Sequence, residues 1–168
     1  MPVMVDIQMA DHYQPLVDQG LVRQAVAATV EHQGWQDMGE VVVVITDDEG
    51  IRQLNREFRG LDNPTDVLAF PGTLEEGFVT PEDYPGYLGD VVISYSRAEA
   101  QAAEAGHPVA RELQLLAIHG VLHLMGLDDA DEAGWRQMMK VQSEILDSLA
   151  SGPPTKEGSN RGGTAIGQ

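Results

Sequence analysis

The sequence predicts a single-domain α/β protein of the α+β type, with a small mixed four-stranded sheet, about five helices and a central helix that carries two histidines. Short β-branched runs alternate with segments of helical period, which indicates both kinds of element. A segment at residues 109–125 is apolar almost all round, as is typical of a helix inside the core. The chain of 168 residues, 42% of them hydrophobic, has about the size of one domain.

The first part of the chain is predicted to contain two strands, each followed by a helix. Apolar residues alternate over 3–9, which indicates a strand with one buried face. They recur every three or four positions over 16–32, which predicts a helix. The β-branched run 40–46 is apolar on both faces, so we expect a buried central strand. Asp47 or Asp48 can then cap a second helix, whose expected buried stripe and end are Ile51, Leu54, Phe58 and Gly60.

The middle of the chain is predicted to form two further strands. Asn63-Pro64-Thr65 indicates a turn, because proline restricts its own backbone and that of the preceding residue. The segment 66–70 continues as a strand that ends at Pro71. Residues 73–86 are rich in Pro, Gly and Glu and predict an exposed loop, after which 87–95 is a fourth strand.

Three helices are predicted in the last part of the chain. Ser96 with Glu99 is a capping-box pattern, and the helix that it begins runs to Gly106. The apolar helix 109–125 ends at Gly126. An amphipathic helix follows over 131–149, and the residues expected on its buried face are Trp135, Met138, Met139, Ile145, Leu146 and Leu149.

The domain is therefore expected to span residues 1–150. Residues 151–168 have too few large apolar side chains to offset the entropy of ordering, which predicts a disordered C-terminal tail. The N-terminus lacks the features of a signal peptide, and no apolar run reaches the roughly 18 residues of a membrane span. We expect a soluble, cytoplasmic protein without a membrane partner.

The charge balance argues against nonspecific binding to nucleic acid. The net charge is −17 with only ten Lys and Arg residues, whereas phosphate binding depends on cationic side chains. Arg52, Arg56 and Arg59 are nevertheless spaced by four and three, which places them along one helical face. This stripe has two interpretations, a solvated helix face or a row of phosphate contacts.

Two histidines in the apolar helix predict a metal site. His119 and His123 are four residues apart, so both imidazoles project from one face of the helix. Gly126 can leave the helical path and return the chain toward them, and Asp129 stands ten residues after His119, where HExxHxxGxxH metalloproteases place their third ligand. With no cysteine in the chain, a transition metal must be bound through His, Asp or Glu. The other histidines, His12, His32 and His107, are expected at the surface.

Two histidines and a carboxylate suit a catalytic zinc ion, which keeps one position open. The same ligand set occurs in non-haem iron oxygenases, so ligand type alone leaves both metals open. The hydrolase spacing favours zinc. A metalloprotease places its general-base glutamate directly after the first histidine, where this chain has Gly120, which argues against ordinary peptide hydrolysis.

The segment HGVLHLMGLDD resembles the HGxLHLxGYDH signature of the YbeY endoribonucleases. The resemblance extends to LNREFRGLDNPTDVLAFP, YLGDVVIS and RELQLLAIHG, in order, over residues 41–149. It implies a zinc-dependent, single-strand-specific endoribonuclease that acts in rRNA maturation, at the 3′ end of the small-subunit rRNA, and in ribosome quality control. It further implies that His119 and His123 are metal ligands, that Arg59 holds and stabilises the phosphodiester during attack by metal-activated water, and that rRNA and the small ribosomal subunit or its assembly factors are partners.

The chain departs from the signature at two positions, since Asp129 replaces the third histidine and Leu127 replaces the tyrosine. An aspartate adds negative charge, which makes a bound water less acidic and favours a harder divalent metal than zinc. A shift along the chain would let Asp128 or Asp131 bind in place of Asp129. Two alternatives to the nuclease stay open: an assembly factor that binds without cleaving, with a structural metal or none, and a metal-dependent hydrolase of another substrate.

Overall fold

The computed structural model describes residues 3–35, 39–72 and 86–151. Two predictions concern segments that lie almost entirely outside these residues, namely the exposed loop at 73–86 and the disordered tail at 151–168. Of these segments, Gly86 and Ser151 alone are described.

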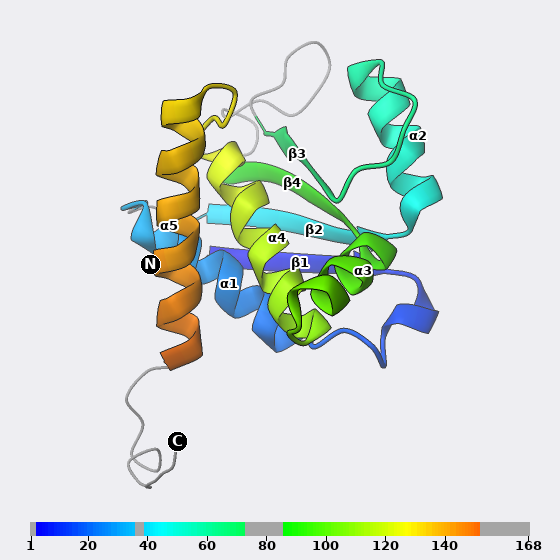
Figure 1. Cartoon of the computed structure of the whole chain (residues 1–168), viewed down its shortest axis with the longest axis horizontal. Coiled ribbons are helices and arrows are strands. Elements are labelled where there is room, and N and C mark those ends of the chain that lie inside the picture. The colour runs from blue at the N-terminus through cyan, green and yellow to red at the C-terminus, as the bar shows by residue number, and fades with distance from the viewer. Residues whose placement is uncertain (1–2, 36–38, 73–85, 152–168) are drawn as a thin grey trace, which may run out of the picture.

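The strands form one mixed sheet, as predicted (Figure 1). Its order is β1-β2-β4-β3, in which β1, β2 and β4 are parallel and β3 runs antiparallel to β4. The β-branched residues of β2 place this strand in the interior of the sheet, whereas β3 forms an edge. The strands are β1 (Val3–Met9), β2 (Gly39–Thr46), β3 (Val67–Pro71) and β4 (Tyr87–Ser94).

The predicted five helices are present within the described residues, together with a short 3-10 helix at Asp11–Tyr13 that the sequence analysis did not predict. Among the described residues, no helix has the length and apolarity that a bilayer span requires. The helices are α1 (Gln19–His32), α2 (Asp48–Arg59), α3 (Tyr95–Ala105), α4 (Val109–Leu124) and α5 (Glu132–Ser151).

The helices cover the sheet unequally (Figure 1). Helix α4 contacts α1, α3 and α5 as well as strands β3 and β4, so it is the central helix that the apolar sequence predicts. Val91 and Ile93 of β4 belong to the large core on the face of the sheet that α4 covers. Val92 points to the opposite face, where it packs with Ile51 of α2 in a smaller cluster. The alternation of side chains along β4 thus builds two cores, and α2 is separated from α4 by the sheet.

Two helices begin at other residues than predicted. The side chain of Asp18 accepts a hydrogen bond from the backbone N–H of Leu21 at 3.3 Å, so α1 begins at Gln19 and not at residue 16. Ser94, and not Ser96, caps α3, because its hydroxyl accepts a hydrogen bond from the backbone N–H of Arg97 at 3.3 Å. In both cases a side chain satisfies a free N–H group of the first helical turn, and this contact decides where the helix starts.

Two aromatic residues that were predicted to be buried are half exposed. Phe58 packs against Phe70 of β3 but is 51% exposed, because β3 is an edge strand and the sheet does not extend beyond it. Trp135 is also 51% exposed. In the first turn of α5 it is Gly134 that faces the preceding loop, where an added Cβ would lie 2.1 Å from the carbonyl oxygen of Asp128.

Gly120 allows α4 to approach the sheet closely. A Cβ at this position would lie 2.5 Å from Cγ1 of Val91 in β4, well inside van der Waals contact. The glycine therefore has a packing role in this helix, and the position that carries a catalytic glutamate in metalloproteases here faces the sheet.

Gly120→Ala is expected to destabilise the protein by about 1–3 kcal/mol through overpacking against Val91, partly offset by the roughly 1 kcal/mol that alanine contributes in a helix. Urea unfolding of the metal-free protein measures this change. Gly20→Ala is the matched control, since a Cβ there meets its nearest atom at 3.4 Å, an ordinary contact distance. Equal effects of the two substitutions would contradict the packing role of Gly120.

Candidate metal centre

His119 and His123 lie on successive turns near the end of α4, as their spacing predicts. Their Nε2 atoms are 3.1 Å apart, and the rings stand nearly edge to face with centroids separated by 4.7 Å. Both side chains are partly buried, at 21% and 31% exposure. The two imidazoles therefore converge on one point at the edge of the core, where both are partly exposed.

The chain reverses direction directly after α4, because Gly126 adopts a left-handed conformation with φ of 100°. The N–H of Gly126 donates to the carbonyl of His123 at 3.1 Å, and the N–H of Leu127 donates to the carbonyl of Leu122 at 3.0 Å. This pair of bonds is the Schellman arrangement that ends many helices at glycine. It brings the residues that follow back toward the histidines.

Of three neighbouring aspartates, Asp129 is the one whose carboxylate lies beside both histidines. Its Oδ2 is 3.7 Å from Nε2 of His119 and 3.9 Å from Nε2 of His123. Asp128 is exposed and accepts a hydrogen bond from the N–H of Ala130 at 2.9 Å. The side chain of Asp131 accepts from the N–H of Gly134 at 2.7 Å in the first turn of α5. The structure thus gives Asp128 and Asp131 local backbone partners.

The three converging atoms fit a transition metal. Zinc bonds of about 2.0–2.1 Å in a tetrahedron separate neighbouring ligand atoms by roughly 3.3 Å. The distances of 3.1, 3.7 and 3.9 Å among the two Nε2 atoms and Oδ2 lie around this value. Within the described part of the chain, His119, His123 and Asp129 form a group that can hold a metal ion.

His119 has a further contact that orients its ring. Nδ1 of His119 forms a short hydrogen bond with Oε1 of Gln142, a buried residue of α5. The pKa of His123 lies below its ordinary value, first because burial disfavours the charged ring and second because His119 is adjacent; Asp129, among others, opposes this shift. A neutral imidazole is the form that offers a lone pair to a metal.

A cleft with a volume of about 490 Å³ lies along the edge strand β3, and His119, His123 and Asp129 are among the residues that line it. Arg59 is the last residue of α2, on the other face of the sheet, and it also lines this cleft. The structure therefore places the predicted functional arginine and the predicted metal ligands in one space.

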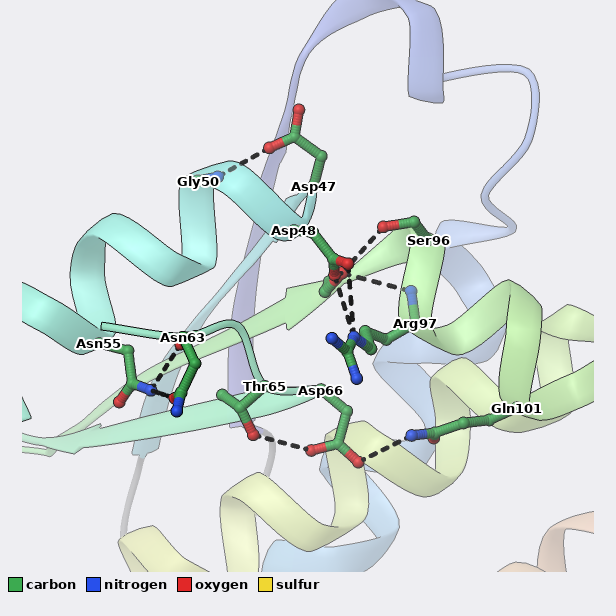
Figure 2. Close-up of polar contacts among 11 residues, drawn as sticks. Asp47, Asp48, Gly50, Asn55, Asn63, Thr65, Asp66, Ser96, Arg97 and Gln101 are labelled. Atoms are coloured by element: carbon green, nitrogen blue, oxygen red, sulfur yellow. Dashed lines mark hydrogen bonds and ion pairs between the residues drawn. The ribbon is translucent and has the colours of Figure 1, made fainter. Parts of the chain in front are cut away.

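A polar network holds the segment between Arg59 and β3 (Figure 2). Asn55 is 2% exposed and donates from Nδ2 to the carbonyl of Asn63 at 2.9 Å. Asp66 accepts from Gln101 of α3 at 3.3 Å through Oδ2, and its carbonyl accepts from the N–H of Ser94 at 2.9 Å. These contacts hold the residues that lead into β3, the strand along the cleft, against α2, α3 and β4.

A second part of this network joins α2 to α3 directly. Oγ of Ser94 donates to Oδ1 of Asp48 at 2.7 Å. Nε of Arg97 donates to the same carboxylate at 3.3 Å (Figure 2). Asp48 lies in the first turn of α2, so these bonds anchor the beginning of the helix whose last residue is Arg59.

The three arginines of the stripe lie in different environments. Arg52 forms ion pairs with Glu49 at 2.6 Å and with Asp62, and its hydrogen bonds hold the pKa of Glu49 at about 2. Arg56 is exposed and does not line the cleft. The interpretation as a solvated face thus suits Arg52, whereas Arg59 lines the cleft together with the predicted metal ligands.

One of the three remaining histidines differs from the prediction. His12 and His32 are exposed, as expected. His107 is partly buried and its Nε2 lies 2.7 Å from Oε1 of Glu112, a carboxylate with 6% exposure. The polar sequence around His107 did not reveal this partner, which lies one turn further along the chain.

The sequence alone did not indicate Gln142 as a residue of the site. A polar residue between Met138 and Ile145 on an otherwise apolar helical stripe was the available signal. Its partner His119 is 23 residues away along the chain. Only the packing of α5 against α4 shows that the two side chains meet.

Comparisons with known proteins find relatives that cover most of this chain. The sequence profile of the family described as endoribonuclease YbeY matches residues 7–150. Endoribonuclease YbeY of Roseiflexus sp. is 46% identical over 150 residues, covering 86% of this chain and 92% of the relative. The protein of the same name from Shouchella clausii is 39% identical over 156 residues, covering 89% and 98%.

A solved structure supports the same assignment. The solution structure of TM1509 from Thermotoga maritima superimposes with a TM-score of 0.55 at 26% identity, covering 92% of this chain and 99% of that one. On these grounds the chain belongs to the endoribonuclease YbeY family.

Proposed function

We propose that this protein is a metal-dependent endoribonuclease that cleaves single-stranded rRNA, in maturation of the 3′ end of small-subunit rRNA and in ribosome quality control. The observation that carries the proposal is the meeting of His119, His123 and Asp129 with Arg59 in one cleft. The relatives named endoribonuclease support the reaction class. We also propose that the protein acts in the cytoplasm, the compartment that contains such an RNA substrate.

The proposed cofactor is one zinc ion per chain, held by Nε2 of His119, Nε2 of His123 and a carboxylate oxygen of Asp129. Two nitrogens and one oxygen suit zinc, and the aspartate also allows another divalent metal. Such an ion supplies Lewis acidity, which activates water as a nucleophile near neutral pH. The protein contributes the fixed orientation of the two rings and one negative charge from Asp129.

Arg59 is proposed to hold the scissile phosphodiester. Its guanidinium can donate two parallel hydrogen bonds to phosphate oxygens and stabilise the charge that develops on them during attack. Arg59 lines the cleft although the chain as a whole has a net charge of −17, which supports this role. We therefore propose that a local cation, and not the overall field, binds the backbone of the RNA.

The proposed partners are single-stranded rRNA and the small ribosomal subunit or its assembly factors. Purified protein incubated with single-stranded rRNA fragments, with and without chelator, tests the reaction. Cleavage of the single strand that stops with chelator and returns with zinc is expected, while a matched duplex stays intact. A protein that shifts the RNA in a gel without cutting it would be a binding factor, and the proposed nuclease would be wrong.

Arg59→Ala is expected to lower RNA cleavage by about a hundredfold or more, the usual effect of removing one donor to a developing oxyanion. Zinc affinity should be unchanged, because Arg59 is no proposed ligand. Arg59→Lys keeps the charge but loses the two-point contact and should recover only part of the rate. Arg56→Ala, on the same helix but outside the cleft, is the control. Equal rates for Arg59→Ala and the control would remove Arg59 from the site.

A further inference from the structure

Gln142 occupies an unusual place for an uncharged polar side chain. It is 6% exposed and lies in α5, whose residues Met138 and Ile145 are buried in the same core. A buried amide is costly unless it forms hydrogen bonds. Its Oε1 meets Nδ1 of His119, and its Nε2 lies 3.8 Å from the sulfur of Met139, a weak acceptor. The amide is thus oriented with its oxygen toward the histidine and its nitrogen toward the sulfur.

This orientation has a chemical consequence for His119. A neutral imidazole has one N–H group and one lone pair, on different nitrogens. An amide oxygen only accepts hydrogen bonds, so its partner Nδ1 must carry the proton. The lone pair is then on Nε2, the atom that faces His123 at 3.1 Å and Asp129 at 3.7 Å.

We propose that Gln142 is a positioning residue that holds His119 in the Nδ1–H form and directs its Nε2 lone pair into the metal centre. The inference rests on the proposed role of His119 as a metal ligand. Partners behind ligating histidines fix the ring and its protonated nitrogen, and their loss typically costs about 10–100-fold in metal affinity.

The neutrality of Gln142 matters as well. Asp129 is the one carboxylate among the three proposed ligands. A glutamine behind His119 orients the ring without adding a second negative charge, which would weaken the Lewis acidity of the bound ion. Gln142→Glu should therefore keep the Nδ1–H form and bind zinc at least as tightly as the wild type, while the rate of RNA cleavage decreases.

Three variants test the role of Gln142. Gln142→Met removes the amide and keeps an unbranched side chain of similar length, and Gln142→Glu keeps an accepting oxygen. Gln114→Met is the matched control, since Gln114 is 8% exposed, lies on α4 with His119 and donates to the carbonyl of Leu21 at 3.0 Å. Thermal unfolding of the metal-free proteins shows whether the two methionine variants lose similar stability.

The first measurement uses the metal-free wild type. Long-range ¹⁵N–¹H correlation spectra of the imidazoles report which nitrogen of His119 carries the proton. The expected result is Nδ1–H in the wild type and in Gln142→Glu, with a shift toward Nε2–H in Gln142→Met. A wild-type His119 that carries its proton on Nε2 at neutral pH would overturn the proposal without reference to any variant.

The second measurement is zinc affinity by competition with a chromogenic chelator. Gln142→Met should bind zinc about 10–100-fold more weakly, whereas Gln114→Met and Gln142→Glu should not lose affinity. Wild-type affinity in Gln142→Met, or an equal loss in Gln114→Met, would overturn the positioning role. Neither measurement involves RNA, so a wild type that binds zinc but cleaves no RNA would refute the proposed function and leave this inference standing.

Discussion

His123→Ala is expected to lose stoichiometric zinc and RNA cleavage together. The substitution removes one of three proposed ligands, and its effect should exceed the roughly 10–100-fold that is typical for partners outside the ligand set. Elemental analysis of the purified wild type and variant measures the bound metal, and chelator competition measures the affinity. His12→Ala is the control, because His12 is exposed and does not line the cleft.

Substitution of two neighbouring aspartates tests which residue is the third ligand. Asp129→Ala should lose zinc, whereas Asp128→Ala should keep it, because Asp129 lies within 3.9 Å of both histidines and Asp128 accepts a hydrogen bond from Ala130. Zinc retained by Asp129→Ala and lost by Asp128→Ala would transfer the ligand role to Asp128. If His123→Ala itself keeps one zinc per chain, the whole centre must be assigned elsewhere.

His107→Ala is expected to destabilise the metal-free protein by about 1–3 kcal/mol, since it leaves a buried carboxylate without its hydrogen-bond partner. Glu112 has only 6% exposure, and His107 lies 2.7 Å from it. Glu112→Gln should cost less than His107→Ala, because its amide oxygen can still accept from His107. Urea unfolding at constant pH measures these changes.

An exposed pair of the same chemical type provides the control. His32 lies 3.4 Å from Glu144, with side-chain exposures of 37% and 49%. Solvent-exposed pairs typically contribute about 0–1 kcal/mol, so His32→Ala should have a small effect. A His107→Ala variant as stable as His32→Ala would show that Glu112 is satisfied without His107.

The fold was predictable where short-range patterns dominate. The β-branched run that became β2 and the apolar helix α4 have strong periodic signals, and both occur as predicted. The capping-box pattern indicates Ser96 as the cap, yet Ser94 has the hydroxyl that meets the first helical turn. Periodicity locates a helix within a few residues, while its end depends on which side chain reaches a free N–H group.

Burial was less predictable than secondary structure. Phe58 falls on the apolar stripe of α2 but packs on the edge strand, and Trp135 falls on the stripe of α5 but stays half exposed. A stripe identifies the side of a helix that faces its neighbours. It does not tell how far those neighbours extend, because that depends on where the sheet and the adjacent helices end.

The sequence by itself determined the fold class, the central helix and the convergence of His119 and His123, because helical spacing and a glycine stop act over a few residues. Tertiary structure alone decided three further matters. It turned Asp129 toward the histidines while Asp128 and Asp131 took backbone partners, it brought Arg59 around β3 into the cleft, and it set Gln142 behind His119. The spacing after His119 favoured Asp129 but left Asp128 and Asp131 open, because the direction of a side chain in a turn depends on its backbone partners. The other two contacts join separate elements, and no local pattern specifies them.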